Sequence, residues 1–175
     1  MAVFKPKYFA TSLDSFAKQV VPPSMYDRWG VQSLDKVDQR ILEFIDDFRH
    51  HVGVPLTCND WSWGGNFSQS GVRDVKFYGS YEKMEKSRSD HISGKACDVR
   101  SSKMTGHELR MKFIEREEYY FDNYGINFIE CGKLGNGSDM SWFHGSINID
   151  LGQGVQYWSP KYGFVNRKRV VEEGL

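Results

Sequence analysis

The chain has 175 residues, a length that suits one domain and permits a sizeable core. Its 23 basic and 23 acidic residues cancel, so no overall field favours nucleic acid or an anionic membrane. No segment approaches the ~20 apolar residues of a membrane span, and the N-terminal segment lacks the apolar core of a signal peptide. We therefore expect a protein made in the cytoplasm, with no nucleic-acid partner and no insertion into a membrane.

The first 50 or so residues predict two helices. Residues 1–19 are expected to form an arm with a short helix, which the following Val-Val-Pro-Pro sequence stops. Residues 20–175 are expected to form a single domain. Ser33 predicts the N-cap of a second helix that ends near His50, and His50 and His51 there would complement the helix dipole without binding a metal. The apolar residues of this helix fall on one face: Leu34, Val37, Ile41, Phe44, Ile45 and Phe48.

The middle of the chain alternates between loops and one helix. Residues 55–80 are rich in glycine, serine and aromatic residues, which predicts loops and short strands. Thr105 and Glu108 form a capping-box pattern, which predicts a helix to about Tyr120. His107, in its first turn, is interpreted as a surface residue. The inward-facing residues are expected to be Leu109, Phe113 and Tyr120.

Two segments near the C-terminal end predict a β-hairpin. Residues 125–133 and 140–150 both alternate with a period of two, and the Gly/Asn/Ser/Asp-rich segment between them predicts a turn. If the two strands pair, Glu130 and His144 project toward the same cavity. The second strand is expected to place Trp142, His144, Ser146 and Asn148 on one face and Phe143, Ile147 and Ile149 on the other. The segment from Gly152 onward gives no clear prediction.

A metal site is predicted around residues 89–98. His91 and Asp98 are two ligand-type side chains separated by the small residues Gly94 and Ala96. His144 is the best candidate for a third ligand, and catalytic zinc sites use three protein ligands and keep one position open. The alternative is that His91 and Asp98 are only a hydrogen-bonded pair in the core, with no metal.

Three more charged residues are candidates for catalysis. Zinc activates water for attack on a carbonyl, and a neighbouring carboxylate can take the proton and return it to the leaving amine. Glu130 is the first choice for this base, and Asp139 in the turn is its rival. Arg73 is the candidate that stabilises the oxyanion.

The three cysteines offer little further chemistry. Cys58, Cys97 and Cys131 are odd in number and form no CxxC pair, which argues against a disulfide scaffold or a cysteine-rich zinc site. Cys97 neighbours Asp98 and is a conceivable nucleophile. A small buried strand residue that points away from Asp98 is the favoured interpretation.

Ordered motifs along the chain resemble one enzyme family. The pattern SxHxxGxAxD is present in full at Ser89, His91, Gly94, Ala96 and Asp98. An SGxR element precedes it at Ser70, Gly71 and Arg73, after an NDWSWGG lead-in at residues 59–65, and a WxH element follows at Trp142 and His144. Over about residues 20–150 the chain resembles the zinc D-alanyl-D-alanine carboxypeptidase and L-alanyl-D-glutamate endopeptidase family, particularly its phage-encoded members.

The resemblance implies an α+β fold in which a small antiparallel sheet, flanked by helices, carries the zinc, as in Hedgehog/DD-peptidase-like domains. It also implies zinc ligands at His91, Asp98 and His144 and a catalytic carboxylate at Glu130. Ser141 stands where the best-known members have a Glu three residues before the last histidine. Many relatives also carry an Asp at the position of Ser146.

The function expected from these residues is zinc-dependent hydrolysis of peptide bonds in the stem peptides of bacterial peptidoglycan. Ser89 and Trp142 are assigned to substrate binding. The protein would be a phage endolysin or virion-associated hydrolase, made in the host cytoplasm and acting in the cell wall, with other phage particle proteins as further candidate partners. The alternative is a catalytically impaired virion protein that keeps zinc in a structural or wall-binding role.

Overall fold

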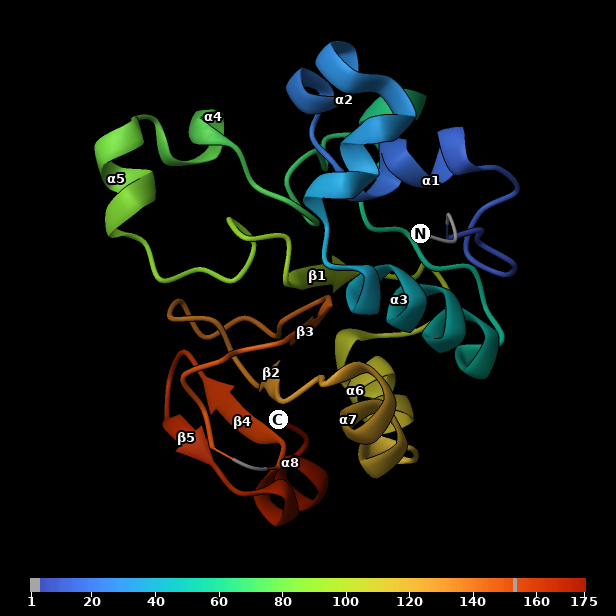
Figure 1. Ribbon diagram of the computed structural model, residues 1–175. Helices are drawn as coiled ribbons and strands as arrows, with labels where there is room; N and C mark the ends of the chain where they lie inside the picture. The colour runs from blue at the N-terminus through green and yellow to red at the C-terminus, as the bar shows by residue number, and fades with distance from the viewer. Residues whose placement is uncertain (1–3, 153) are drawn as a thin grey trace.

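The computed structural model describes residues 4–152 and 154–175 and shows a mixed α+β fold (Figure 1). A small sheet has the strand order β1-β3-β2-β4-β5, and helices flank it. The α+β expectation is confirmed at this level. The sheet is mixed rather than purely antiparallel, because β4 runs parallel to β2. The strands are β1 (Ala96–Val99), β2 (Phe128–Glu130), β3 (Phe143–Ser146), β4 (Gln156–Ser159) and β5 (Gly163–Val165).

Some helices lie at the two ends of the sheet, and α3, α6 and α7 pack together beside it. In Figure 1, α1, α2, α4 and α5 lie beyond β1, whereas α8 lies beside β4 and β5. None of the helices in the described part of the chain is long and apolar enough to cross a membrane. The helices are α1 (Leu13–Val20), α2 (Pro23–Trp29), η1 (Gly30–Lys36, a 3-10 helix), α3 (Gln39–Val52), η2 (Trp61–Trp63, a 3-10 helix), α4 (Val75–Tyr78), α5 (Tyr81–Lys86), α6 (Gly106–Ile114), α7 (Glu117–Tyr124) and α8 (Arg167–Glu173).

Helix α3 supplies the centre of the core, but it begins later than predicted. Asp38, not Ser33, is the N-cap, and its carboxylate accepts a hydrogen bond from the Arg40 N–H at 3.0 Å. Ser33 instead donates to the Gly30 carbonyl inside η1. The predicted apolar stripe is buried as expected. Its aromatic members Phe44 and Phe48 pack against aromatic rings from α6, α7 and β3, which are Phe113, Tyr120 and Phe143.

The predicted capping box is present at the start of α6. The Thr105 N–H donates to Glu108 Oε2 at 2.7 Å, and the Glu108 N–H donates to Thr105 Oγ1 at 3.1 Å. The single helix expected to reach Tyr120 is instead two helices, because the backbone leaves the helical region at Arg116. The inward-facing residues Leu109, Phe113 and Tyr120 are all fully buried, as predicted.

Strands β2 and β3 pair antiparallel, which confirms the predicted hairpin. Cys97 is fully buried on the core face, opposite Asp98 along β1, and burial raises the pKa of its thiol well above the ordinary value. Cys97 is therefore a packing residue. The predicted strand is too long: β3 ends at Ser146, so Ile149 does not share the buried face of Phe143 and is 77% exposed.

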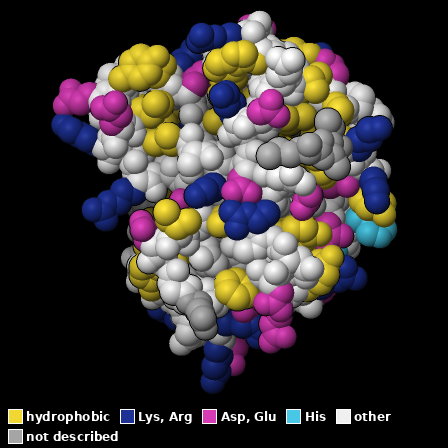
Figure 2. Space-filling view, viewed as in Figure 1, with side chains coloured by type: hydrophobic (Ala, Val, Ile, Leu, Met, Phe, Trp, Pro, Cys, Tyr) yellow, Lys and Arg dark blue, Asp and Glu magenta, His cyan; other side chains and the backbone are white. Residues whose placement is uncertain are grey.

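Two terminal segments contribute more than the sequence indicated. Phe9 and Phe16 belong to the hydrophobic core, and the Asp46 carboxylate accepts hydrogen bonds from the N–H groups of residues 7–9. The last residues form β4, β5 and α8, which no sequence pattern clearly predicted. On the face shown in Figure 2, basic and acidic side chains are interspersed, and histidine is visible only at the right-hand edge.

Candidate metal centre

Three polar side chains stand in a row across the middle of the sheet. Asp98 on β1 is opposite His144 on β3, and His144 is opposite Glu130 on β2. Directly opposed residues of antiparallel strands share a face and lie close together. The register therefore places Glu130 and His144 on the same face, as the hairpin prediction required.

The structure brings His91, Asp98 and His144 together in a buried group. His144 Nδ1 lies 2.8 Å from Asp98 Oδ1, and His91 Nε2 lies 3.5 Å from Asp98 Oδ2. One ligand atom from each residue lies within 4.8 Å of the others. His91 is 2% exposed, and Asp98 and His144 are each 6% exposed. This group could bind a metal ion.

A tight turn presents His91 to the group. The Ile92 N–H donates to the Ser89 carbonyl at 3.1 Å, and Gly94 closes the turn with a φ of 68°. A Cβ at Gly94 would lie 2.2 Å from the Lys36 carbonyl oxygen, so no larger residue fits against η1. The glycine of the motif is thus required by both the backbone conformation and the packing.

Charge interactions in the group favour an ionised Asp98. Burial would by itself raise the pKa of Asp98, but the charge of His91 and the hydrogen bond from His144 outweigh it and hold that pKa well below its usual range. Burial lowers the pKa of His91. The pKa of His144 is raised, because the hydrogen bond to Asp98 and the nearby Glu130 charge outweigh burial.

The donor set and one orphaned atom fit a zinc ion. His91 Nε2 is buried, and within the described residues it has no hydrogen-bond partner. His91 Nδ1 lies 2.5 Å from the Gly71 carbonyl, the kind of outer contact that orients a metal-binding imidazole. Two imidazole nitrogens and one carboxylate oxygen match the ligand types of catalytic zinc sites. His91, Asp98 and His144 would hold the ion.

Arg73 joins the group from the loop that precedes α4. Its Nη2 donates to Asp98 Oδ2 at 2.9 Å, and its Nε donates to the Gln69 carbonyl at 3.0 Å. The Phe77 ring lies 4.3 Å from its guanidinium carbon. A Cβ at Gly71 would lie 2.0 Å from the Val20 carbonyl oxygen, so Gly71 lets this loop pack against the end of α1.

A cavity of about 380 Å³ opens beside the buried group. Asp98 and Arg73 lie in its wall, and so does the predicted substrate-binding residue Trp142. Ser89, the other residue assigned to substrate binding, is half-buried in the turn before His91, and its N–H donates to Ser87 Oγ at 3.3 Å.

Asp139 lies apart from this group in the exposed turn between β2 and β3. Its carboxylate accepts a hydrogen bond from Lys133 Nζ at 2.8 Å, and its side chain is 82% exposed. The hydrogen bond from Lys133 lowers the pKa of Asp139. Among the described residues, the group that could hold a metal does not include Asp139.

The sheet contributes side chains that the sequence reasoning did not assign. Trp158 on β4 is the neighbour of Glu130, and Phe164 on β5 is the neighbour of Trp158, so the row continues across all five strands. Exposure rises along the row, from 6% at Asp98 and His144 to 60% at Phe164. The side chains of this row are therefore buried over β1 and β3 and exposed over β5. The alternation of burial along residues 156–159 fits a strand that places Trp158 on this face.

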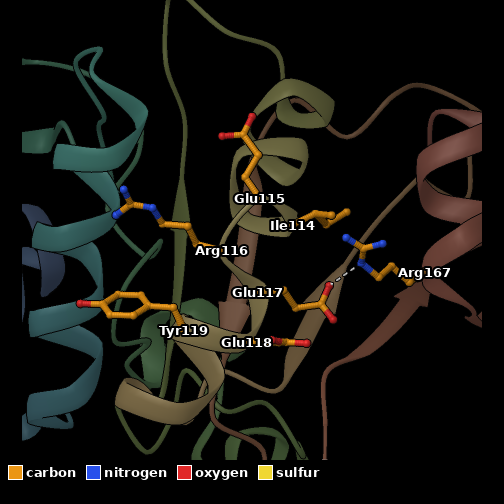
Figure 3. Close-up of a pocket in the computed structure, with 7 residues that line it drawn as sticks. All are labelled: Ile114, Glu115, Arg116, Glu117, Glu118, Tyr119 and Arg167. Carbon is orange, nitrogen blue, oxygen red and sulfur yellow. Dashed lines mark hydrogen bonds and ion pairs between the residues drawn. The ribbon is translucent and has the colours of Figure 1, made fainter.

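A second cavity, of about 710 Å³, lies at the junction of α6, α7 and α8 (Figure 3). Glu117 and Arg167 form an ion pair across it at 3.1 Å. Glu115 and Glu118 also line it, but within the described residues these carboxylates form no group that could hold a metal. Its size alone does not make it a catalytic site.

No family model matches this chain, and neither a curated protein nor a solved structure matches it. The functional assignment therefore depends on the geometry of the His91, Asp98 and His144 group and on the sequence motifs. 

Proposed function

We propose that this protein is a zinc-dependent peptidase that hydrolyses peptide bonds in bacterial peptidoglycan stem peptides. The observation that carries the proposal is the buried group of His91, Asp98 and His144, with the orphaned Nε2 of His91, next to a carboxylate on the same sheet face. The choice of peptidoglycan comes from the SxHxxGxAxD, SGxR and WxH resemblance.

The residues of the site would have three roles in the chemistry: binding the metal, transferring a proton and stabilising negative charge. A zinc ion held by the two histidines and Asp98 would supply a Lewis acid for water and for the amide carbonyl. Glu130 accepts the proton of the attacking water on its carboxylate and returns it to the leaving nitrogen. Arg73 supplies a fixed positive charge for the developing oxyanion. The cavity that Asp98, Arg73 and Trp142 line supports entry of the substrate from the β1 side.

Glu130 is favoured over Asp139 as the base by position. Glu130 is the cross-strand neighbour of His144, whereas the Asp139 carboxylate is bound to Lys133 in an exposed turn. The family's usual Glu position holds Ser141 here, and Ser141 lies in the wall of the cavity beside Asp98. A carboxylate from the neighbouring strand would thus replace one from the same strand.

The decisive experiment is the composition of muropeptides before and after incubation with zinc-loaded protein. We expect new fragments cut at one kind of peptide bond, and we expect their formation to stop on chelation and return with zinc. Metal analysis of protein purified without chelators should give one zinc per chain. Absence of zinc would overturn the metal assignment, and cleavage that persists after complete chelation would overturn the mechanism.

A second candidate function is favoured by Ser141. A virion protein that binds zinc without catalysis needs no carboxylate at this position. Stoichiometric zinc without cleavage of muropeptides from several wall chemotypes would support this alternative, and release of any fragment would exclude it.

A further inference from the structure

Arg100 is a half-buried cation in the wall of the 380 Å³ cavity, two residues after Asp98. Its Nη1 donates to the Cys58 carbonyl at 2.7 Å and to Ser70 Oγ at 3.2 Å. Both acceptors are neutral. Within the described part of the chain, Arg100 is in no ion pair, so its charge faces the cavity without a carboxylate partner.

The cavity holds two guanidinium groups and a single carboxylate. Asp98 is that carboxylate, and it already contacts His91, His144 and the second guanidinium, Arg73. The rest of the wall is neutral. A carboxylate group on a ligand would therefore enter a region of net positive charge, whereas an ammonium group would be repelled.

Aromatic rings cover the flat faces of both guanidinium groups. The Phe67 ring centroid lies 3.6 Å from the guanidinium carbon of Arg100, as the Phe77 ring covers Arg73. Stacking of this kind occupies the face of a guanidinium and leaves its N–H edge available. That edge is suited to two parallel hydrogen bonds with a carboxylate.

Asp98 and Arg100 line one cavity, which is small enough for a single substrate residue to reach both. The two residues are on the same face of an extended backbone, about 7 Å apart by strand geometry. The residue after a cut amide bond carries its α-carboxyl group two bonds from the amide nitrogen, so a bond held beside Asp98 keeps this carboxyl inside the cavity. In a stem peptide this carboxyl is free in both candidate substrates, because D-Glu continues the chain through its side chain and the last D-Ala ends it.

We propose that Arg100, with its guanidinium stacked on Phe67, binds the free α-carboxylate of the residue that follows the cut bond and so determines substrate specificity. This inference rests on the proposed function, since it places the cut bond at the His91, Asp98 and His144 group. It predicts a preference for D-Glu over D-isoglutamine, or for a free terminal D-Ala over its amide.

The test compares substrates that differ only in this charge. The full chain, loaded with zinc, is given stem peptides with D-Glu or D-isoglutamine after L-Ala, and stem peptides with a free or amidated terminal D-Ala. For the pair that is cut, kcat/KM should favour the carboxylate about 10- to 100-fold, as expected for a charge-assisted hydrogen-bond pair. Arg100→Gln should abolish this preference, because it should lower kcat/KM for the carboxylate substrate more than for the amide substrate.

Two further variants separate recognition from stability, because Arg100 also holds the Cys58 and Ser70 segment. Arg100→Lys keeps the charge without the planar fork and should retain part of the preference. Arg169→Gln removes another stacked arginine, which is on α8 and lies over the Tyr162 ring. This change should leave the preference intact. Equal loss of both substrates in Arg100→Gln, or a preference that survives it, would overturn the proposal.

A binding measurement distinguishes failure of this inference from failure of the proposed function. Calorimetry with the same peptides and the zinc-loaded Glu130→Ala protein should show tighter binding of the carboxylate form, lost in the additional Arg100→Gln change. A carboxylate held by the metal itself would keep its advantage without Arg100, which would contradict the proposal. If the wild-type chain cuts no peptide but this binding difference is present, catalysis is wrong and the carboxylate site stands.

Discussion

Two of the cavities in this protein differ in how they are assembled, and that difference favours the smaller as the candidate site. The larger, at the α6–α7–α8 junction, is lined by six consecutive residues of one segment and by Arg167 (Figure 3). The smaller is lined by side chains from loops, β1 and the approach to β3, which are far apart in sequence. Burying the polar side chains of distant segments together lowers the stability of the fold more than leaving polar side chains exposed in a surface hollow.

The charges of the two cavities differ in the same way. In the larger, Glu117 is paired with Arg167, and Glu115 is paired with Lys112 at 2.9 Å. In the smaller, Asp98 contacts three cationic or titratable groups, while Arg100 has no described ion pair. The larger cavity therefore holds two ion pairs, whereas the smaller lies beside the buried Nε2 of His91, which has no hydrogen-bond partner among the described residues. Variants in either cavity can test this comparison.

The largest effect is expected from His91→Ala. This change removes an imidazole whose loss leaves only two protein ligands, and loss of outer contacts alone already weakens metal binding about 10- to 100-fold. We therefore expect zinc to be lost after dialysis and cleavage of muropeptides with it. Metal analysis and muropeptide analysis on one preparation check this. A His91→Ala protein with full zinc content would show that His91 is a core residue and not a ligand.

Glu130→Gln should separate turnover from metal binding. The change keeps the size of the side chain but removes the proton acceptor, so kcat should fall about 10²- to 10⁴-fold with zinc retained. Asp139→Asn is the matched control, because its carboxylate is bound to Lys133 in the exposed turn, and it should keep wild-type turnover. The reverse pattern would assign the base to Asp139.

The sequence predicted the grouping of His91, Asp98 and His144 better than the fold around it. His91, Gly94 and Asp98 belong to one short segment, so their spacing could be recognised locally. Glu130 and His144 could be related through the period of two in a hairpin. In these parts, local pattern and tertiary structure agree.

The errors arose where long-range contacts decide the structure. Ser33 and Asp38 are both good N-cap residues, but the Asp38 N–H donates to the Gly94 carbonyl at 3.0 Å, which holds the start of α3 against the His91 turn. The parallel pairing of β4 with β2 has no local signal of the kind a hairpin provides. The role proposed for Arg100 had no local signal, because it depends on Phe67 and on a cavity formed by distant segments.

Asn59→Ala should destabilise the loop at Ser70, which lines the smaller cavity, although Asn59 itself does not line it. Asn59 is fully buried, its Nδ2 donates to the Val21 carbonyl at 3.1 Å, and its Oδ1 accepts from the Ser70 N–H at 2.8 Å. Because truncation leaves a buried N–H without this acceptor, the free energy of unfolding should fall by about 2 kcal/mol. Denaturant titration measures it. Asn123→Ala, an exposed amide on α7, is the control and should cost less than about 0.5 kcal/mol; equal losses would remove the special role of Asn59.

The smallest effect is expected in the larger cavity, from Glu117→Gln. The Arg167 side chain is 55% exposed, so solvent screens the pair, and its loss should lower the free energy of unfolding by at most about 1 kcal/mol. The Tyr157 hydroxyl also donates to Glu117. Burial raises the pKa of Tyr157, so the hydroxyl stays protonated and the amide oxygen of Gln can still accept its hydrogen bond. Zinc content and muropeptide cleavage should remain at wild-type values, measured beside Glu130→Gln. A loss of either in Glu117→Gln would mean that the two cavities are coupled through β4, because Tyr157 and Trp158 are neighbours on that strand and Trp158 lies beside Glu130.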